Sequence, residues 1–214
     1  MQLVYVGGKV ENRLGQNRGI NDKVKEALAP RLPPVEPSLA PSIEQEGMIK
    51  GAVIDPTELY RYSLWREWNR NAPRVAFVML NPSTADSDFD DTTIRRCIYF
   101  AKSWGYGSLE VVNLFAYRAT EPEDLRHVKD PVGSENDRYL LEATERAARI
   151  IVAWGKVGCQ RHQDQAVLHL IADNHRLYCL GMTKDGHPRH PLYVGRNTTP
   201  VLFPVPPLQL VLPL

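Results

Sequence analysis

The sequence predicts an α/β protein with a three-layer α/β/α sandwich, built on a central and mostly parallel sheet of about four strands, as in small doubly wound folds. Two observations support this prediction. Short apolar runs typical of buried strands alternate with segments of helical spacing, which is the pattern of βαβ units and parallel sheets. The chain of 214 residues is also long enough for one domain whose core needs no disulfide or structural metal.

The expected domain spans residues 48–203. The preceding residues 1–47 are interpreted as an extension, because the segment Ala29–Ser42 is rich in proline, a composition typical of linkers without regular structure. The final residues 204–214 are interpreted as an apolar tail of prolines and leucines. Near the start of the domain, Ala52–Ile54 is expected to form an edge strand.

The segment Tyr60–Trp68 mixes aromatic residues with arginines, and its periodicity fits either a strand or a helix. We interpret it as an amphipathic surface with stacked guanidinium groups. The alternative is an aromatic and basic platform for nucleic acid.

The first buried strand is predicted at Val75–Met79, where five apolar residues follow one another. It ends before Asn81-Pro82, because proline has no N–H to donate to a sheet. A helix is predicted over Thr93–Trp104, with Asp91-Thr92 at its N-cap. Strands and helices then alternate, and the remaining elements are expected at Leu109–Leu114, Gly133–Arg149 with Ser134 as its cap, Ile150–Ala153, Cys159–Asn174 and Leu177–Leu180.

Composition and missing motifs exclude several classes of protein. The formal net charge is +1, so no global basic field indicates a nucleic acid, and only a local patch could bind one. Cys97, Cys159 and Cys179 form no C-x-x-C pair, which argues against a zinc ribbon or iron–sulfur site. An odd cysteine count without a secretory segment indicates a reducing cytoplasm, and no apolar run is long enough to span a membrane. The glycine-rich phosphate loops and the G-x-S-x-G elbow of a serine nucleophile are also missing. Neither a cofactor nor a metal is expected.

Polar residues, or a tryptophan and glycine, come at the end of each expected strand. In a parallel sheet these ends share one rim, which is where ligands bind. Asn113 is the most informative of them, because an amide inside an apolar run must find partners or cost a few kcal/mol. It is either satisfied by neighbouring backbone or reads the donor and acceptor edge of a ligand. The residues at the expected rim are Asn81, Ser83, Asn113, Trp154, His187 and His190.

The motifs LNPSTAD, DDTTIRRC, WGYG, VVNLFAYRAT, AWG and PRHPLY together resemble an uncharacterised bacterial and phage family, a domain of unknown function, over roughly Gly51–Val194. The order of motifs also resembles the uracil-DNA glycosylase superfamily. Leu80-Asn81-Pro82 is similar to its water-activating motif, and Val111–Phe115 to the strand whose asparagine recognises the flipped base. Ile151–Gly155 is similar to its strand ending in Trp-Gly, and His187–Tyr193 to its histidine–proline–leucine loop. The aspartate and tyrosine that the most active uracil branch has in the first motif are missing.

This second resemblance implies an enzyme that cleaves the N-glycosidic bond of an unusual or modified base in DNA, in repair or in antiviral defence. Asn81 would position the water, Asn113 would read the base, and His190, or alternatively His187, would donate a hydrogen bond to the departing base. Stacking or contact with the base is expected of Phe115, Phe89, Tyr99, Ser83 and Trp154. DNA contact is expected of Lys184, Arg189 and Arg196, with Leu192 and Tyr193 as a wedge.

Three alternatives stay open at this point. Clustered carboxylates can hold magnesium or manganese for phosphodiester hydrolysis, although they can equally form a solvated loop that caps the next helix. A pocket without chemistry would make the chain a nucleotide- or DNA-binding module. A nucleoside hydrolase would bind its substrate with little salt dependence, unlike an enzyme acting on DNA. The carboxylates concerned are Asp86, Asp88, Asp90 and Asp91.

Overall fold

The computed structural model describes residues 47–172 and 176–205, so nearly all of the expected extension 1–47 and of the tail 204–214 lies outside the described residues. The strands are β1 (Ile49–Ile54), β2 (Arg61–Glu67), β3 (Arg74–Met79), β4 (Ser108–Asn113), β5 (Arg149–Val152), β6 (Leu177–Cys179) and β7 (Val201–Leu202). The helices are α2 (Thr92–Ser103), α3 (Asn136–Arg146) and α4 (Gln163–Ile171), with shorter 3-10 segments η1 (Pro122–Arg126), η2 (Lys156–His162) and η3 (Pro191–Tyr193).

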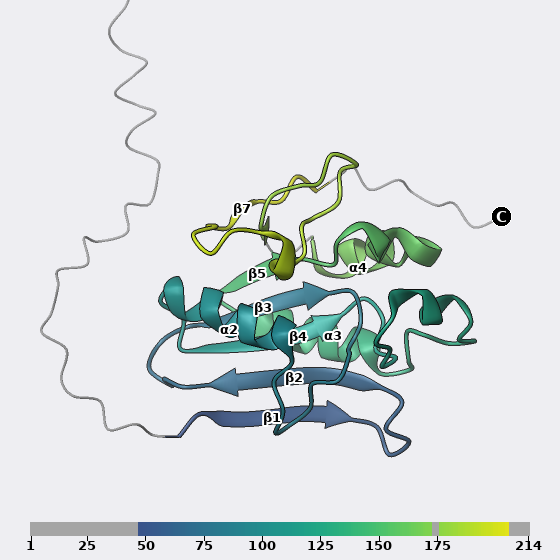
Figure 1. The fold of residues 1–214 in the computed structure, drawn as a ribbon, viewed down its shortest axis with the longest axis horizontal. Helices are drawn as coiled ribbons and strands as arrows, with labels where there is room; N and C mark the ends of the chain where they lie inside the picture. The colour runs from purple at the N-terminus through teal and green to yellow at the C-terminus, as the bar shows by residue number, and fades with distance from the viewer. Residues whose placement is uncertain (1–46, 173–175, 206–214) are drawn as a thin grey trace, which may run out of the picture. The chain divides into compact units, whose positions relative to one another are not determined.

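The described strands form one mixed sheet of seven strands in the order β1-β2-β4-β3-β5-β6-β7 (Figure 1). The four strands β4, β3, β5 and β6 run parallel to one another. The β1–β2, β2–β4 and β6–β7 pairs are antiparallel. The predicted fold class, a mostly parallel glycosylase-like sheet of about four strands, is therefore wrong. Hydrophobic periodicity identifies a strand but says nothing about the direction in which its neighbour runs.

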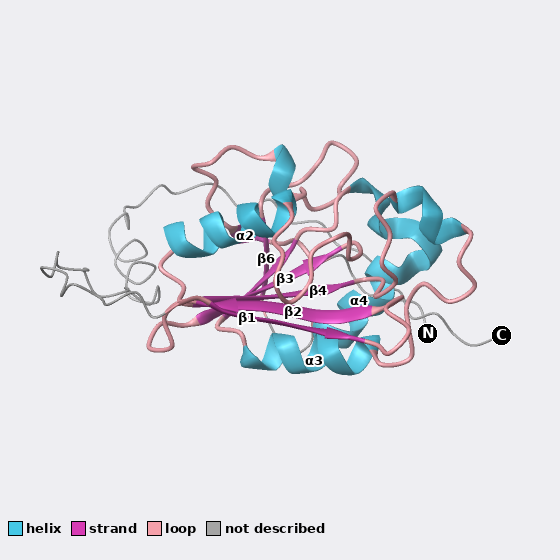
Figure 2. Ribbon diagram, turned by 60° about the horizontal axis from the view of Figure 1, so that its bottom comes forward, coloured by secondary structure: helices cyan, strands magenta, loops and turns pink. Residues whose placement is uncertain are grey.

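Helices cover both faces of the sheet, with α2 on one face and α3 on the other (Figure 2). Alternate residues of β3 point to opposite faces, as the period of a strand requires. Val75, Phe77 and Met79 belong to the buried cluster on the α2 side, and Ala76 and Val78 belong to the cluster on the α3 and α4 side.

Local chemistry sets the ends of the helices. Asp91 caps α2 as predicted, because its Oδ1 accepts a hydrogen bond from the backbone N–H of Ile94 at 2.8 Å. The helix predicted at Gly133–Arg149 starts later, at Asn136, since Gly133 has a φ of 84°. The helix predicted from Cys159 starts at Gln163, after residues with positive φ. No helix among the described residues is long and apolar enough to cross a membrane.

Segment Tyr60–Trp68 contains strand β2, and the prediction of an amphipathic surface is wrong. β2 lies between β1 and β4, so its arginines are enclosed: Arg61 is 2% exposed and Arg66 is fully buried. The pairing with β1 shifts between Val53↔Ser63 and Ile54↔Arg61, so β2 carries one extra residue there. Such a bulge re-aims the side chains beyond it.

Candidate active site

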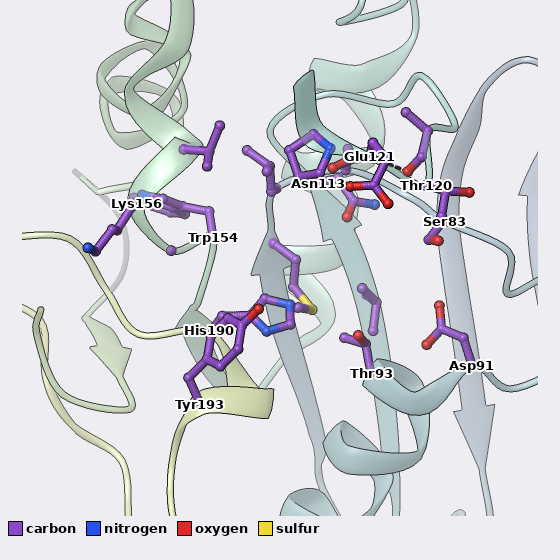
Figure 3. A pocket seen from close by; sticks show the side chains of 18 of the residues that line it. Ser83, Asp91, Thr93, Asn113, Thr120, Glu121, Trp154, Lys156, His190 and Tyr193 are labelled. Atoms are coloured by element: carbon purple, nitrogen blue, oxygen red, sulfur yellow. Dashed lines mark hydrogen bonds between the residues drawn. The ribbon is translucent and has the colours of Figure 1, made fainter. Parts of the chain in front are cut away.

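A cavity of about 910 Å³ lies at the rim where β3, β4 and β5 end (Figure 3). Its volume is within the range of about 300–1,000 Å³ that small-molecule and cofactor sites occupy. The segments following these strands supply much of its lining, and the loop before η3 supplies another part. The predicted residues that line it are Asn81, Ser83, Asn113, Trp154, Lys184, Arg189, His190 and Tyr193.

Asn81 follows β3 and has a fixed side chain. Its Nδ2 donates hydrogen bonds to the carbonyl oxygens of Pro82 at 2.9 Å and Ala119 at 2.7 Å. Both hydrogens of the amide nitrogen are thereby used. The side chain's remaining polar atom is the carbonyl oxygen Oδ1, which can only accept a hydrogen bond. Asn81 is thus arranged to hold a donor such as water.

Asn113 is the last residue of β4, and its side chain is 1% exposed. The buried Asn136 fixes its backbone, since Asn136 Nδ2 donates to the carbonyl oxygens of Asn113 at 3.0 Å and Leu114 at 3.1 Å. The Nδ2 of Asn113 itself has no partner among the described residues. A buried polar group left in this state costs about 1–3 kcal/mol. The free amide can therefore read a ligand that offers a matching edge.

His190 precedes η3 and lines the cavity as an uncharged donor (Figure 3). Its Nδ1 accepts a hydrogen bond from the backbone N–H of Leu192 at 3.3 Å, so the proton of the neutral ring is on Nε2. Burial lowers the pKa of His190 to about 4, with only a small opposing effect from Asp91. The imidazole is neutral at physiological pH.

Hydrogen bonds to its backbone carbonyl groups hold the loop around His190 against the sheet and against α2. The N–H of Gly155, which follows β5, donates to the carbonyl oxygen of Pro188 at 3.0 Å. On the other side, Arg96 of α2 donates to the carbonyl oxygens of Pro191 and Val194. The position of His190 is therefore set by the sheet and by α2 together.

Arg61 lines the same cavity, although sequence reasoning did not identify it as a site residue. Because β2 runs antiparallel to β4, the start of β2 lies at the rim where β4 ends. Arg61 Nη1 donates to the carbonyl oxygen of Ala85 at 2.7 Å, whereas Nε has no partner among the described residues. Burial lowers the pKa of Arg61 to about 10, so the guanidinium stays charged at neutral pH.

The cavity also has charged groups on its walls. Lys156, Lys184 and Arg189 contribute positive charge, and Asp91 and Glu121 contribute negative charge. Tyr193 is 80% exposed and lines the cavity as well. Of these, Lys156 and Glu121 were missed by sequence reasoning, as were Thr93 and Thr120. Thr93 and Thr120 lie inside the motifs DDTTIRRC and VVNLFAYRAT, but nothing in those motifs distinguishes them as site residues.

Six predicted site residues are not brought together with the others. His187 lines a second cavity of about 260 Å³ on the other side of Trp154. Phe115 is 1% exposed and belongs to the core on the α3 side, so it cannot stack on a ligand. Tyr99 is 40% exposed and lies under the guanidinium of Arg196, whose central carbon is 5.7 Å from the ring centroid. The residues outside the lining of the large cavity are His187, Phe115, Phe89, Tyr99, Leu192 and Arg196.

The acidic loop is occupied by its own structural contacts. Asp86 Oδ1 accepts hydrogen bonds from the backbone N–H groups of Asp88 and Phe89, and Asp90 is paired with Arg66 at 2.7 Å. Asp91 caps α2. Within residues 47–172 and 176–205, no group of three or more His, Cys, Asp or Glu side chains is placed to hold a metal ion. The loop therefore gives no support to the alternative of a metal-dependent nuclease.

Comparison with known proteins gives one match. A family model described as "Protein of unknown function (DUF1643)" matches residues 61–192, which is more than half of the chain. The match covers the sheet from β2 to β6, together with every residue that lines the cavity except Tyr193. Neither a curated protein nor a solved structure matches the chain.

Proposed function

The chain belongs to the DUF1643 family of proteins of unknown function, and we propose that it is a DNA glycosylase that hydrolyses the N-glycosidic bond of an unusual or modified base. One observation carries this proposal. A buried amide with no partner in the part of the chain that the structure describes, Asn113, shares a cavity with a neutral imidazole, His190, that has a proton to donate. An amide of this kind can pair with the edge of a base, and the imidazole can stabilise that base as it departs.

The reaction replaces the bond between C1′ and the base nitrogen by a bond from C1′ to water oxygen. The electron pair of the broken bond leaves with the base, whose carbonyl oxygen gains negative charge. His190 Nε2–H donates a hydrogen bond to that oxygen, in a site where burial strengthens the interaction. No proton has to leave His190 during this step, because a hydrogen bond from a neutral donor suffices.

Asn81 supports the other half of the reaction. Its Oδ1 accepts a hydrogen bond from the attacking water, which orients a lone pair of the water toward C1′. This amide orients the water without taking its proton, so we expect modest rates. The proton that the water loses on attack passes through solvent to the departing base anion, which is released as the neutral base. The carboxylate of Asp91 lines the same cavity and favours the positive charge that develops on the sugar.

The cavity's charged rim supports a DNA strand as the carrier of the base. Lys156, Lys184 and Arg189 can contact phosphates, and the exposed ring of Tyr193 can enter the gap that a flipped base leaves. Phosphate contacts make affinity fall steeply with salt. A free nucleoside as substrate would not show this dependence.

A base-release assay tests the proposal. Duplexes carrying uracil, mismatched thymine or a hypermodified pyrimidine are incubated with the wild-type protein and with Asn81→Ala, and free base and abasic sites are quantified. Release from at least one duplex that is lowered by Asn81→Ala supports the proposal. The control is Arg70→Gln, a change at an exposed position in the turn after β2, which should leave release unchanged. Release from none of the duplexes, or equal release by Asn81→Ala, overturns it.

A further inference from the structure

Two buried arginines in strand β2 differ in how many of their side-chain N–H groups have a hydrogen-bond acceptor. Arg66 Nε is paired with Asp90 Oδ1 at 2.7 Å, and its two terminal nitrogens donate to backbone carbonyl oxygens, among them those of Trp65 at 2.8 Å and Asp86 at 2.7 Å. Among the described residues the side chain of Arg61 has a single hydrogen bond, from Nη1 to the carbonyl oxygen of Ala85. It forms no ion pair with any residue that the structure describes, although it is 2% exposed.

Two carboxylates act on the charge of Arg61, and each holds one or two backbone N–H groups with its Oδ1. Asp86 and Asp91 favour its charged form from a distance, and Arg66 and Arg118 oppose it. Asp86 Oδ1 accepts two backbone N–H groups of its own loop, and Asp91 Oδ1 accepts the N–H of Ile94. A buried guanidinium without a counter-ion is unfavourable unless another group supplies the missing acceptor.

The free edge of Arg61 has a defined geometry. Since Nη1 is bound to Ala85, the remaining edge of the guanidinium is the one formed by Nε and Nη2. This edge grips a carboxylate or phosphate with two parallel hydrogen bonds. Arg61 lies beside the end of β4, because its backbone N–H donates to the carbonyl oxygen of Ala116 at 2.9 Å, three residues beyond Asn113. Both Arg61 and Asn113 line the large cavity.

We propose that Arg61 binds an anionic group of the ligand, a carboxylate or a phosphate, next to the part of the ligand that Asn113 contacts. This inference rests on the proposed function only for the statement that the rest of the ligand is a nucleobase. The anion comes either from a substituent on the base or from the phosphate of the same nucleotide. In both cases a neutral, unsubstituted base leaves Arg61 without its partner.

Calorimetric titration with two matched pairs of ligands tests the inference. The first pair is uracil and 5-carboxyuracil, and the second is deoxyuridine and its 5′-monophosphate. A charge-assisted contact predicts that one anionic member binds the wild-type protein about ten- to a hundredfold more tightly than its neutral counterpart. A preference within the first pair identifies a base substituent as the source, and a preference within the second identifies the phosphate.

Variants assign the preference to Arg61. Arg61→Gln should remove most of it, Arg61→Lys should retain part of it, and Arg70→Gln, in the exposed turn after β2, should leave it intact. If Arg61→Gln does not fold, because its contact with Ala85 is lost, the wild-type comparison and Arg61→Lys still decide. Equal binding within both pairs, no binding by any of the four ligands, or a preference that survives Arg61→Gln overturns the inference.

The experiments can support the anion site and contradict the glycosylase, or the reverse. An anion preference that depends on Arg61, without base release from any duplex, supports the anion site and counts against the enzyme. Base release at equal rates from duplexes with neutral and carboxylated bases, together with equal binding within both ligand pairs, supports the enzyme and overturns the anion site.

Discussion

Asn136 donates its side-chain Nδ2 to the backbone carbonyl oxygen of Asn113 at 3.0 Å, and neither residue is more than 1% exposed. The contact secures residue 113 through its backbone and leaves its side-chain amide free. Asn136 Oδ1 also has no partner among the described residues, but Asn136 does not line the cavity, whereas Asn113 does. Asn136 is therefore a structural residue, and Asn113 is available to a ligand. The two should respond to mutation in opposite ways.

Asn113→Leu should raise the free energy of unfolding by about 1–2 kcal/mol, because it replaces an unpartnered buried amide by an apolar side chain of similar size. Asn136→Ala should lower it by about 2–3 kcal/mol, because two buried hydrogen bonds are lost. Urea titration of both variants measures these changes. If Asn113→Leu proved as destabilising as Asn136→Ala, the Asn113 amide would have a structural partner and no role in binding.

His190 should make stability depend on pH in a specific window. Its pKa is about 4 in the folded protein against 6.5 in the unfolded chain, so the unfolded chain binds more protons between these values. The lowered pKa of His190 therefore contributes about 3 kcal/mol to the free energy of unfolding. This contribution is complete above pH 6.5 and is lost as the pH falls through 4. Unfolding free energies of wild type and His190→Gln, compared from pH 7 to pH 4, isolate this difference from the titration of carboxylates. Parallel curves would mean that the His190 pKa is not lowered.

Base release should lack the inflection that an ordinary histidine produces. Because the neutral ring donates through Nε2 and its pKa is about 4, lowering the pH from 8 to 5 leaves it in the active form. A single-turnover rate constant measured over this range should change little on account of His190. An inflection near pH 6.5 that disappears in His190→Gln would contradict the assigned protonation state.

Chelation should leave base release unchanged. Among residues 47–172 and 176–205 no cluster of acidic or histidine side chains is arranged for a metal ion, and the reaction described for Asn81 and His190 needs none. Rates with and without excess EDTA, after dialysis, should agree within error. A loss of base release that magnesium or manganese restores would contradict this metal-free reaction.

The sequence was informative about strands and about one rim of the sheet. The apolar runs at Val75–Met79 and Leu109–Leu114 coincide closely with β3 and β4, because a buried strand needs apolar residues on both faces. Residues directly after such strands could be assigned to one rim, and Asn81, Asn113 and His190 do line one cavity.

The direction in which neighbouring strands pair and the direction in which side chains point could not be predicted from the sequence in this way. The antiparallel edge strands overturned the predicted sheet, and only the antiparallel pairing of β2 with β4 brings Arg61 to the cavity. The bulge in β2 has no signature in the sequence. Phe115 illustrates the same limit: it directly follows the rim in sequence but points into the core.

The most direct test is the single-turnover rate of base release by wild type and by His190→Leu, measured with enzyme in excess over a duplex that wild type cleaves. Loss of the Nε2 donor should lower the rate about a hundredfold, the size of effect seen when one donor to a developing oxyanion is removed, with DNA affinity unchanged. Equal rates for the two proteins would contradict the account, because the cavity would then hold a base without acting on it.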